Sequence, residues 1–271
     1  MPELPEVETV CRGIRPHVVG QEISRIVVRQ PKLRYPVSRR LPGLLVGQTV
    51  RQVGRRAKYI LLQCEPGTVI IHLGMSGSLR IVAGDEPPGR HDHVDICLAS
   101  GHCLRYRDPR RFGSIVWAGQ KPDNHRLLRV IGPEPFSASL TAAYLYELAR
   151  GRRSAVKNFI MDSHVIAGVG NIYASEALFY AGIHPARAAG RIALSRYQRL
   201  LASIRQVLEA AIDNGGTTLR DFYQADERPG YFKQQLAVYD RAGHACNQCG
   251  ALIRNLTLGQ RASYYCPRCQ S

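Results

Sequence analysis

The sequence predicts an α+β chain, in which an antiparallel β-sandwich with an N-terminal helix is followed by a helical region and a small cysteine-rich module. Three observations predict this class. Short strand-like runs crowd between 22 and 117, helical periodicity dominates from 141 to 214, and two Cys-x-x-Cys pairs stand near the C-terminus. We therefore expect three domains, covering residues 1–131, 132–236 and 237–271.

The first expected element is a helix that begins near Pro5, because proline suits the first position of a helix. Glu6 and Glu8 then place negative charge at the positive end of the helix dipole. The apolar residues that follow recur at helical spacing and form one face, made of Val7, Val10, Cys11 and Ile14. Burial of this face would hold the start of the helix in one place.

Short strand-like runs follow the helix. They cover residues 22–29, 49–55, 59–64, 68–73, 78–82, 92–98, 102–107 and 113–117. A basic loop with prolines, 31–42, separates the first two, and Ser100-Gly101 is typical of a hairpin turn. Short strands with turns at this spacing favour an antiparallel sandwich or barrel, and no βαβ alternation competes with that interpretation.

The second half of the chain is helical in pattern. It follows a stiff Gly-Pro-Glu-Pro stretch at 132–135. The expected helices cover residues 141–150, 154–161, 171–181 and 195–214. Residues 217–233 contain charges and aromatics without a period, which predicts a long mobile loop of the kind that often carries function.

The chain is strongly basic, with 37 Lys and Arg against 21 Asp and Glu and a formal charge of +16. Such an excess suits a polyanionic partner. The acidic N-terminus is unlike a secretory signal, and no apolar run approaches the roughly 20 residues of a membrane span. We expect a cytoplasmic monomer without a membrane partner. In that reducing compartment the scattered cysteines should be small buried or half-buried hydrophobes, namely Cys11, Cys64, Cys97 and Cys103.

Four cysteines near the C-terminus have the spacing of a zinc ribbon. They are Cys246, Cys249, Cys266 and Cys269, and sixteen residues separate the two pairs. Four thiolates form a closed tetrahedral site, so one zinc ion would fold this module and perform no chemistry. A redox or free-thiol role is the alternative. The segment between the pairs predicts a hairpin with Arg261 near its tip, where a guanidinium could hold a phosphate.

The N-terminus combines a potential nucleophile with carboxylates. Removal of Met1 would expose Pro2 as a secondary amine with a pKa near that of an α-amino group, about 8. A secondary amine that attacks an aldehyde-like sugar carbon forms an iminium with a fixed positive charge, which promotes elimination. Glu3 and Glu6 are close enough in sequence to move the protons. An ordinary acidic helix cap is the competing interpretation.

The N-terminal motif Pro-Glu-Leu-Pro-Glu-Val-Glu-Thr begins at Pro2, and further motifs follow in order at 55–59, 72–77, 108–112 and 168–173. On these motifs, with the four cysteines, the whole chain resembles the formamidopyrimidine-DNA glycosylase family of bacterial enzymes. The resemblance implies a DNA glycosylase and lyase that excises oxidised purines, 8-oxoguanine and formamidopyrimidines, from duplex DNA through an iminium at Pro2. It also implies strand cleavage by β,δ-elimination and a helix–two-turns–helix unit in the second half.

The resemblance assigns backbone contacts as well. Lys58 matches the lysine that contacts the phosphate beside the lesion, and we group Lys58 and Arg261 with the catalytic residues Pro2, Glu3 and Glu6. Asn171 matches a phosphate-binding asparagine after a Gly-x-Gly turn, although such a turn is often only a tight connection. Lys157 is a weaker candidate for the same task.

An enzyme that extracts a base from a duplex must fill the space left behind and hold the orphaned partner. Met75 lies in a glycine-flanked loop, and Arg110, Arg111 and Phe112 lie in another. An apolar wedge, an aromatic ring and an Arg that reads a base edge would do this, and the family uses the positions of Met75, Phe112 and Arg110 in that way. Arg111 more naturally holds a phosphate. His93, in the segment His91-Asp92-His93, is kept as a DNA-binding candidate, although this segment favours a structural hydrogen-bonding cluster over a metal site.

Two alternatives stay open at this stage. The sister enzyme endonuclease VIII removes oxidised pyrimidines with a similar fold and terminal proline, but Leu4 and Val7 favour the purine branch. A non-catalytic zinc-ribbon nucleic-acid binder would explain the charge and the cysteines, but gives no reason for an amine beside two carboxylates. Arg220 departs from the family pattern, which often has Lys there, so its contact with a lesion is left open.

Overall fold

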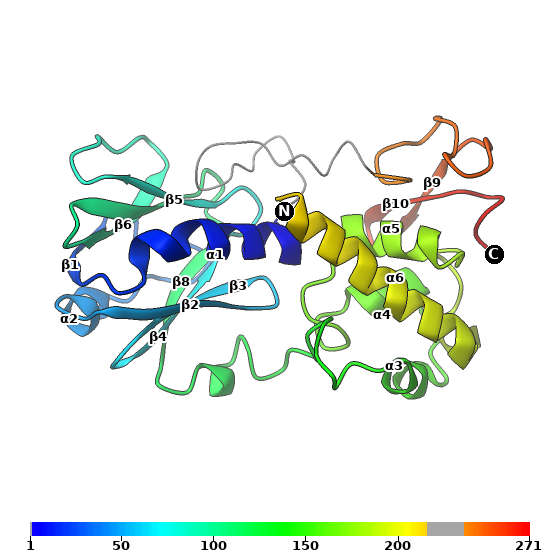
Figure 1. Ribbon diagram of the computed structural model, residues 1–271, viewed down its shortest axis with the longest axis horizontal. Helices are drawn as coiled ribbons and strands as arrows, with labels where there is room; N and C mark the ends of the chain where they lie inside the picture. Colours follow the sequence, from blue (N-terminus) through cyan, green and yellow to red (C-terminus); the bar gives the residue numbers. More distant parts are fainter. Residues whose placement is uncertain (1, 216–235) are drawn as a thin grey trace. The chain divides into compact units, whose positions relative to one another are not determined.

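The computed structural model describes residues 2–215 and 236–271. Its contacts divide the chain into two compact units (Figure 1), one containing residues 2–129 and the other containing residues 130–213 and 236–271. The segment 217–233 and Arg220, for which the sequence predicts a loop, lie outside the described residues. No helix in the described part of the chain is long and apolar enough to cross a membrane.

The first unit is an antiparallel β-sandwich, as the sequence predicts. One sheet has the order β1-β6-β7-β5 and the other β2-β3-β4-β8. The strands are β1 (Ile23–Val28), β2 (Val50–Arg56), β3 (Tyr59–Cys64), β4 (Gly67–His72), β5 (Ser78–Ala83), β6 (Asp92–Leu98), β7 (His102–Arg107) and β8 (Ser114–Gly119). Each of the expected strand-like runs is therefore confirmed, three of them with the expected ends and the others with ends that differ by at most two residues.

Helix α1 (Leu4–Val18) contacts strands of both sheets, β2 and β3 in one and β5 in the other. Its predicted apolar face is fully buried, with Val7, Val10, Cys11 and Ile14 each 0% exposed. Pro5 is the second helical residue rather than the first, because the helix begins at Leu4. The sandwich core thus fixes the start of α1. A nucleophile at Pro2, as expected from the sequence, would require this fixed position.

Two features of the first unit differ from the sequence-based expectation. Helix α2 (Leu41–Leu45) forms at the end of the basic loop, because Leu41 and Leu45 are fully buried against the core despite Pro42 and Gly43. Cys97 and Cys103 form a disulfide, whereas we expected free thiols. The register of β6 and β7 places these two residues directly opposite each other, which only strand pairing decides. A 3-10 turn, η1 (Pro122–Asn124), follows β8.

The second unit is helical and ends in a hairpin, again as expected. Its helices are α3 (Ala142–Ala149), α4 (Val156–Met161), α5 (Asn171–Tyr180) and α6 (Leu194–Asp213), with a 3-10 turn η2 (Ala189–Arg191). Helix α5 contacts α4, α6 and the strand β10 (Arg261–Tyr265), which pairs with β9 (Arg254–Leu258). Helix α5 is buried on nearly every side, since residues 172–179 are all buried, so its N-terminal residue is rigidly placed.

Candidate active site and nucleic-acid interface

The start of α1 is a reciprocal cap built from two carboxylates. The backbone N–H of Glu3 donates to Oε2 of Glu6 over 2.8 Å, and the Glu3 side chain accepts from the backbone of Glu6. Glu3 is 3% exposed and Glu6 is 1% exposed, and Pro2 beside them is also buried. The structure therefore brings together the three N-terminal residues that the sequence singles out.

Two loops of the first unit lie against each other through glycines. Gly74 has φ +68°, and a Cβ there would lie 2.5 Å from the backbone nitrogen of Gly113. A Cβ on Gly113 would in turn lie 2.3 Å from the carbonyl oxygen of His72. Only glycine permits this close approach, so the loop that carries Met75 is held beside the loop that carries Phe112.

The buried side chain of Asp108 fixes the conformation of the loop that carries Phe112. It is 0% exposed, and its carboxylate accepts hydrogen bonds from the hydroxyls of Ser76 and Tyr106 and from the backbone N–H groups of Arg110 and Gly113. Buried polar groups in folded proteins are satisfied by hydrogen bonds, as this carboxylate is. Asp108 thereby fixes where residues 109–113 leave the core.

The expected wedge residues are exposed on this platform. Met75 is 39% exposed and Phe112 48%, and the guanidinium carbon of Arg110 lies 4.7 Å from the centre of the Phe112 ring. Together with Arg34, His72 and Gly74 they line a cavity of about 360 Å³. Large exposed apolar side chains beside a stacked Arg are suited to an unstacked duplex. Arg111 is exposed too, in a backbone conformation with φ 56°.

His72 is a site residue that the sequence-based analysis missed. Burial, with smaller contributions from Lys58 and Arg34, lowers the pKa of His72 to about 4. The neutral ring accepts the N–H of Gly74 at Nδ1 over 2.9 Å, which places its proton on Nε2 as a donor. Its position just before the glycine-flanked loop is a signal that could have identified it.

Lys58 lies in the two-residue turn between β2 and β3, after Ala57 with φ 52°. Lys58 is close enough for its charge to help lower the pKa of His72, which lines the cavity. The preceding Arg55 serves another purpose, since it is paired with Glu8 of α1 over 3.1 Å. Lys58 is only partly buried.

Asn171 begins α5, directly after Gly168 with φ +79° and Gly170 at the N-cap. Its Nδ2 donates to the carbonyl oxygen of Ala262 in β10 over 3.1 Å, and its Oδ1 accepts no hydrogen bond from the described residues. The start of α5 is thus joined to the hairpin one residue from Arg261. Arg261 itself is exposed as the first residue of β10, after a turn in which Gly259 and Gln260 both have positive φ.

Two predicted DNA contacts are corrected by their burial. Lys157 is 0% exposed, and its ammonium group donates to the carbonyl oxygen of Ala262 and to Oγ of Ser263, over 3.0 and 2.7 Å. It therefore holds the hairpin against α4 instead of reaching a phosphate. His93 is 5% exposed, and its Nε2 donates to the carbonyl oxygen of Asp108 over 2.8 Å, so the structural interpretation of His93 is the one supported.

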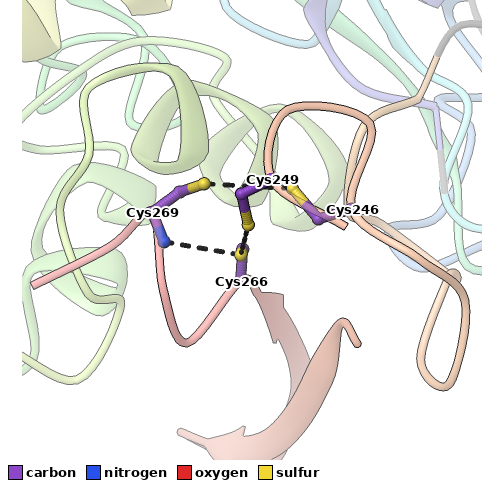
Figure 2. Close-up of side chains that lie close together, drawn as sticks. All are labelled: Cys246, Cys249, Cys266 and Cys269. Carbon is purple, nitrogen blue, oxygen red and sulfur yellow. Dashed lines mark hydrogen bonds between the residues drawn. The ribbon is translucent and has the colours of Figure 1, made fainter. Parts of the chain in front are cut away.

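The four clustered cysteines converge on one point (Figure 2). Their sulfur atoms all lie within 4.8 Å of one another, with 3.9 Å between Cys246 and Cys269 and 3.5 Å between Cys249 and Cys266. A tetrahedral zinc with Zn–S bonds of about 2.3 Å requires sulfurs about 3.8 Å apart. Burial and the neighbouring thiols raise the pKa of Cys269, an effect that a bound cation reverses. The site fits one structural zinc ion.

Fold and site together define a zinc-finger protein of the DNA glycosylase class. Family models match its parts in order: the formamidopyrimidine-DNA glycosylase N-terminal domain over residues 1–115, the H2TH domain of the same enzymes over 131–223, and the zinc finger found in FPG and IleRS over 243–271. The chain therefore belongs to the formamidopyrimidine-DNA glycosylase family.

Relatives and solved structures agree with this assignment. The chain is 59% identical to the formamidopyrimidine-DNA glycosylase of Syntrophotalea carbinolica and 56% identical to that of Alkalilimnicola ehrlichii, each over 100% of both chains. It is similar to Lactococcus lactis Fpg in complex with DNA that contains an abasic site, with TM-score 0.93, 33% identity and 100% of both chains covered. The Thermus thermophilus protein gives TM-score 0.88 at 36% identity, over 99% of this chain and 98% of that one.

Proposed function

We propose that this chain excises oxidised purines from duplex DNA and cuts the strand at the emptied sugar, with Pro2 as the nucleophile. The observation that carries the proposal is the buried N-terminal cap, in which Pro2 adjoins the paired carboxylates of Glu3 and Glu6. The relatives named above support it, as do the Lactococcus lactis Fpg complexes with abasic-site and Fapy-dG DNA.

The chemistry begins at the amine that removal of Met1 exposes. The Pro2 nitrogen attacks the sugar C1′, the bond from C1′ to the purine nitrogen breaks, and the base leaves with a proton. Opening of the sugar ring gives an iminium, whose positive charge acidifies the C2′ proton. Loss of that proton expels the 3′ phosphate by β-elimination, and a second proton loss expels the 5′ phosphate by δ-elimination. Water then hydrolyses the iminium, which releases the sugar remnant as an aldehyde and restores the Pro2 amine.

The two carboxylates have different tasks in this scheme. Glu6 is engaged by the backbone of Glu3, so it acts as a positioning residue for the segment that carries the amine. Glu3 is the group that assists sugar-ring opening and moves protons between the sugar and the departing groups. Its near-complete burial strengthens its interaction with the iminium.

The remaining residues bind DNA. Lys58, Asn171, Arg111 and Arg261 hold backbone phosphates, contacts that position the duplex without reading its sequence. Met75 and Phe112 fill the space of the extruded nucleotide, and Arg110 reads the orphaned base opposite. The zinc ion, when bound, folds the hairpin that presents Arg261. The enzyme would act as a monomer in the cytoplasm.

Borohydride trapping on an 8-oxoguanine duplex tests the mechanism. Reduction of the iminium should lock the protein to DNA, and peptide mapping should place the cross-link on Pro2. Pro2→Gly should keep some trapping through a primary amine at a lower rate. Retention of Met1 should abolish trapping and leave binding intact, because only the nucleophile is blocked.

A matched pair of variants separates Glu3 from the other carboxylates of α1. Glu3→Gln should slow base release and have less effect on a duplex that already lacks the base. Glu8→Gln should leave both steps unchanged, because Glu8 is paired with Arg12 and Arg55 on the side of the helix. A cross-link at Lys58 would overturn the mechanism. Faster excision of thymine glycol than of 8-oxoguanine would assign the chain to oxidised pyrimidines instead.

A further inference from the structure

Tyr35 lies between two exposed arginines of the first unit. The guanidinium carbon of Arg126 lies 4.5 Å from the centre of the Tyr35 ring, and that of Arg34 lies 5.7 Å away. Both arginines are exposed and the tyrosine is half-buried. The residues come from segments about ninety positions apart, so only the fold brings them together.

Both segments are anchored, which gives the cluster a defined geometry. In the first, Leu33 and Val37 are buried, and the backbone N–H of Arg34 donates to the carbonyl oxygen of Gly113 over 3.1 Å. In the second, Leu128 is buried and its N–H donates to the carbonyl oxygen of His125. Arg126 therefore projects from a fixed turn that follows η1, and is not at the end of a loose loop.

The charges of the two arginines are not neutralised within the described residues. Neither guanidinium has a carboxylate within ion-pairing distance there, and Asp123, three residues before Arg126, makes no ion pair with it. Burial, and next the charge of Arg126, lower the pKa of His125, so this neighbour adds no charge at neutral pH. Two cations held beside one ring are most stable when an anion joins them.

Stacking leaves the hydrogen-bonding edge of a guanidinium available. A carboxylate partner would occupy the N–H donors of Arg126, whereas the face of Tyr35 orients the guanidinium plane and occupies none of them. A planar fork with its donors facing solvent matches the geometry of a phosphate. This arrangement is better suited to binding the phosphates of a nucleic-acid backbone than to binding the surface of another protein.

The cluster is continuous with the cavity described above. Arg34 lines that cavity with His72, Met75, Arg110 and Phe112. It is also close enough to help lower the pKa of His72. A duplex whose unstacked step meets Phe112 would therefore continue past Arg34 toward Tyr35 and Arg126.

We propose that Arg126, oriented by the ring of Tyr35 and joined by Arg34, binds a backbone phosphate of the duplex outside the damaged step. This subsite rests on the proposed function in one respect, namely that the ligand is duplex DNA. It would give the first unit a phosphate contact in addition to that of Lys58, and it would strengthen binding to damaged and undamaged duplexes alike.

The salt dependence of binding tests the subsite. The probe is a duplex with a tetrahydrofuran abasic analogue opposite cytosine, alongside the undamaged duplex of the same sequence. Because each phosphate contact contributes about 0.9 to the slope of log K against log salt, Arg126→Gln should lower that slope by about 0.9 on both duplexes. If affinities converge at 1 M salt, this corresponds to about eightfold weaker binding at 0.1 M.

Variants of Tyr35 separate orientation from simple charge. Tyr35→Phe keeps the ring and should bind as the unaltered protein does, whereas Tyr35→Leu should lose part of the Arg126 effect. Arg51→Gln is the charge-matched control, since Arg51 is exposed but already paired with Glu65 over 3.4 Å. The thermal unfolding midpoint of each variant shows whether a loss of DNA affinity is caused by unfolding.

Phosphate ethylation interference locates the contact. One ethylated phosphate outside the lesion should weaken binding by the unaltered protein and have no effect on Arg126→Gln. Three results would each overturn the subsite. The salt-dependence slope of Arg126→Gln could equal that of the unaltered protein, it could equal that of Arg51→Gln, or the ethylation interference pattern of Arg126→Gln could be identical to that of the unaltered protein. Excision of 8-oxoguanine, measured separately, reports on the proposed function whichever way the binding result falls.

Discussion

Two structures that carry proposed DNA contacts, the loop 108–113 and the β9–β10 hairpin, are held in place by different means. The loop rests on a sandwich core of 26 buried residues, large enough to orient it through one buried carboxylate, Asp108. The hairpin rests on a cluster of only six buried residues, two of which are the metal-binding Cys246 and Cys266. A module this small cannot bury enough apolar surface to fold alone, so a metal supplies what the core does not.

The same contrast extends to how each region is joined to its surroundings. Close backbone contacts at Gly74 and Gly113 fix the loop 108–113 to the loop that carries Met75, and one side-chain hydrogen bond, from Ser76 to Asp108, also joins them. The hairpin module is tied to the helices by buried polar groups instead. Glu176 of α5 accepts the backbone N–H groups of residues 237, 238 and 239, and Lys157 of α4 donates to β10. A large apolar core with one buried carboxylate holds the loop 108–113, whereas metal coordination and hydrogen bonds to the helices hold the hairpin.

Loss of zinc should have the largest effect and should be confined to the hairpin. Cys266→Ser should release the metal and unfold the module, because zinc binding contributes on the order of 10–16 kcal/mol in such fingers. Zinc content and proteolysis of residues 243–271 measure this. Cys64→Ser, which alters a buried thiol outside the cluster, should keep one zinc per chain. Equal zinc loss in both variants would contradict the assignment.

Asp108→Asn should destabilise the conformation of the loop 108–113 and leave the zinc bound. An amide group would face donors that the carboxylate now accepts, at a cost of about 1–3 kcal/mol in the free energy of unfolding. The thermal midpoint should fall, and preference for the base opposite the lesion should fall with it. Asp123→Asn, at an exposed position, should change neither. A reduced zinc content in Asp108→Asn would show that the two regions are not independent.

Arg110 and Asn171 should separate base reading from backbone binding. Arg110→Ala should relax the preference for cytosine opposite the lesion by about 1–3 kcal/mol, since a contact to a base edge is lost. Asn171→Ala should weaken every duplex and should leave that preference unchanged. Affinities for 8-oxoguanine paired with each of the four bases test this. Losses independent of the opposite base in both variants would refute the division.

Acid should destabilise the first unit through His72. The folded-state pKa of His72 is lowered to about 4, mainly by burial, so the unfolded chain binds its proton first as pH falls. The stability that the neutral ring contributes is complete above pH 6.5 and is lost as the pH falls toward 4. After allowance for partial exposure we expect a loss of about 1–2 kcal/mol.

Comparison with His72→Gln isolates this effect. Both proteins release zinc in acid, so the difference between their unfolding free energies cancels that contribution. The difference should change between pH 6.5 and pH 4 and be constant above pH 6.5. A constant difference over the whole range would mean that His72 does not titrate in this way.

The sequence by itself determined the elements and several of the key residue types. Short strand-like runs with turns between them located the strands of the sandwich, helical spacing located α1 and α3 to α6, and the cysteine spacing identified the zinc site. These signals are local, because a residue's face on a strand or helix follows from its spacing alone. The motif at Pro2 likewise needed no long-range information.

Only the tertiary structure decided which side chains are buried and which meet. The sequence placed Lys157 and His93 among the DNA contacts, but packing buries both and gives them hydrogen-bond partners outside their own helix or strand. Strand register paired Cys97 with Cys103, and the fold brought Arg126 to Tyr35. The contact of Lys157 spans 106 positions, that of His93 spans 15 and the disulfide spans 6, and each depends on how separate elements pair or pack. Local periodicity carries no record of them, because they arise only when separate elements pack together.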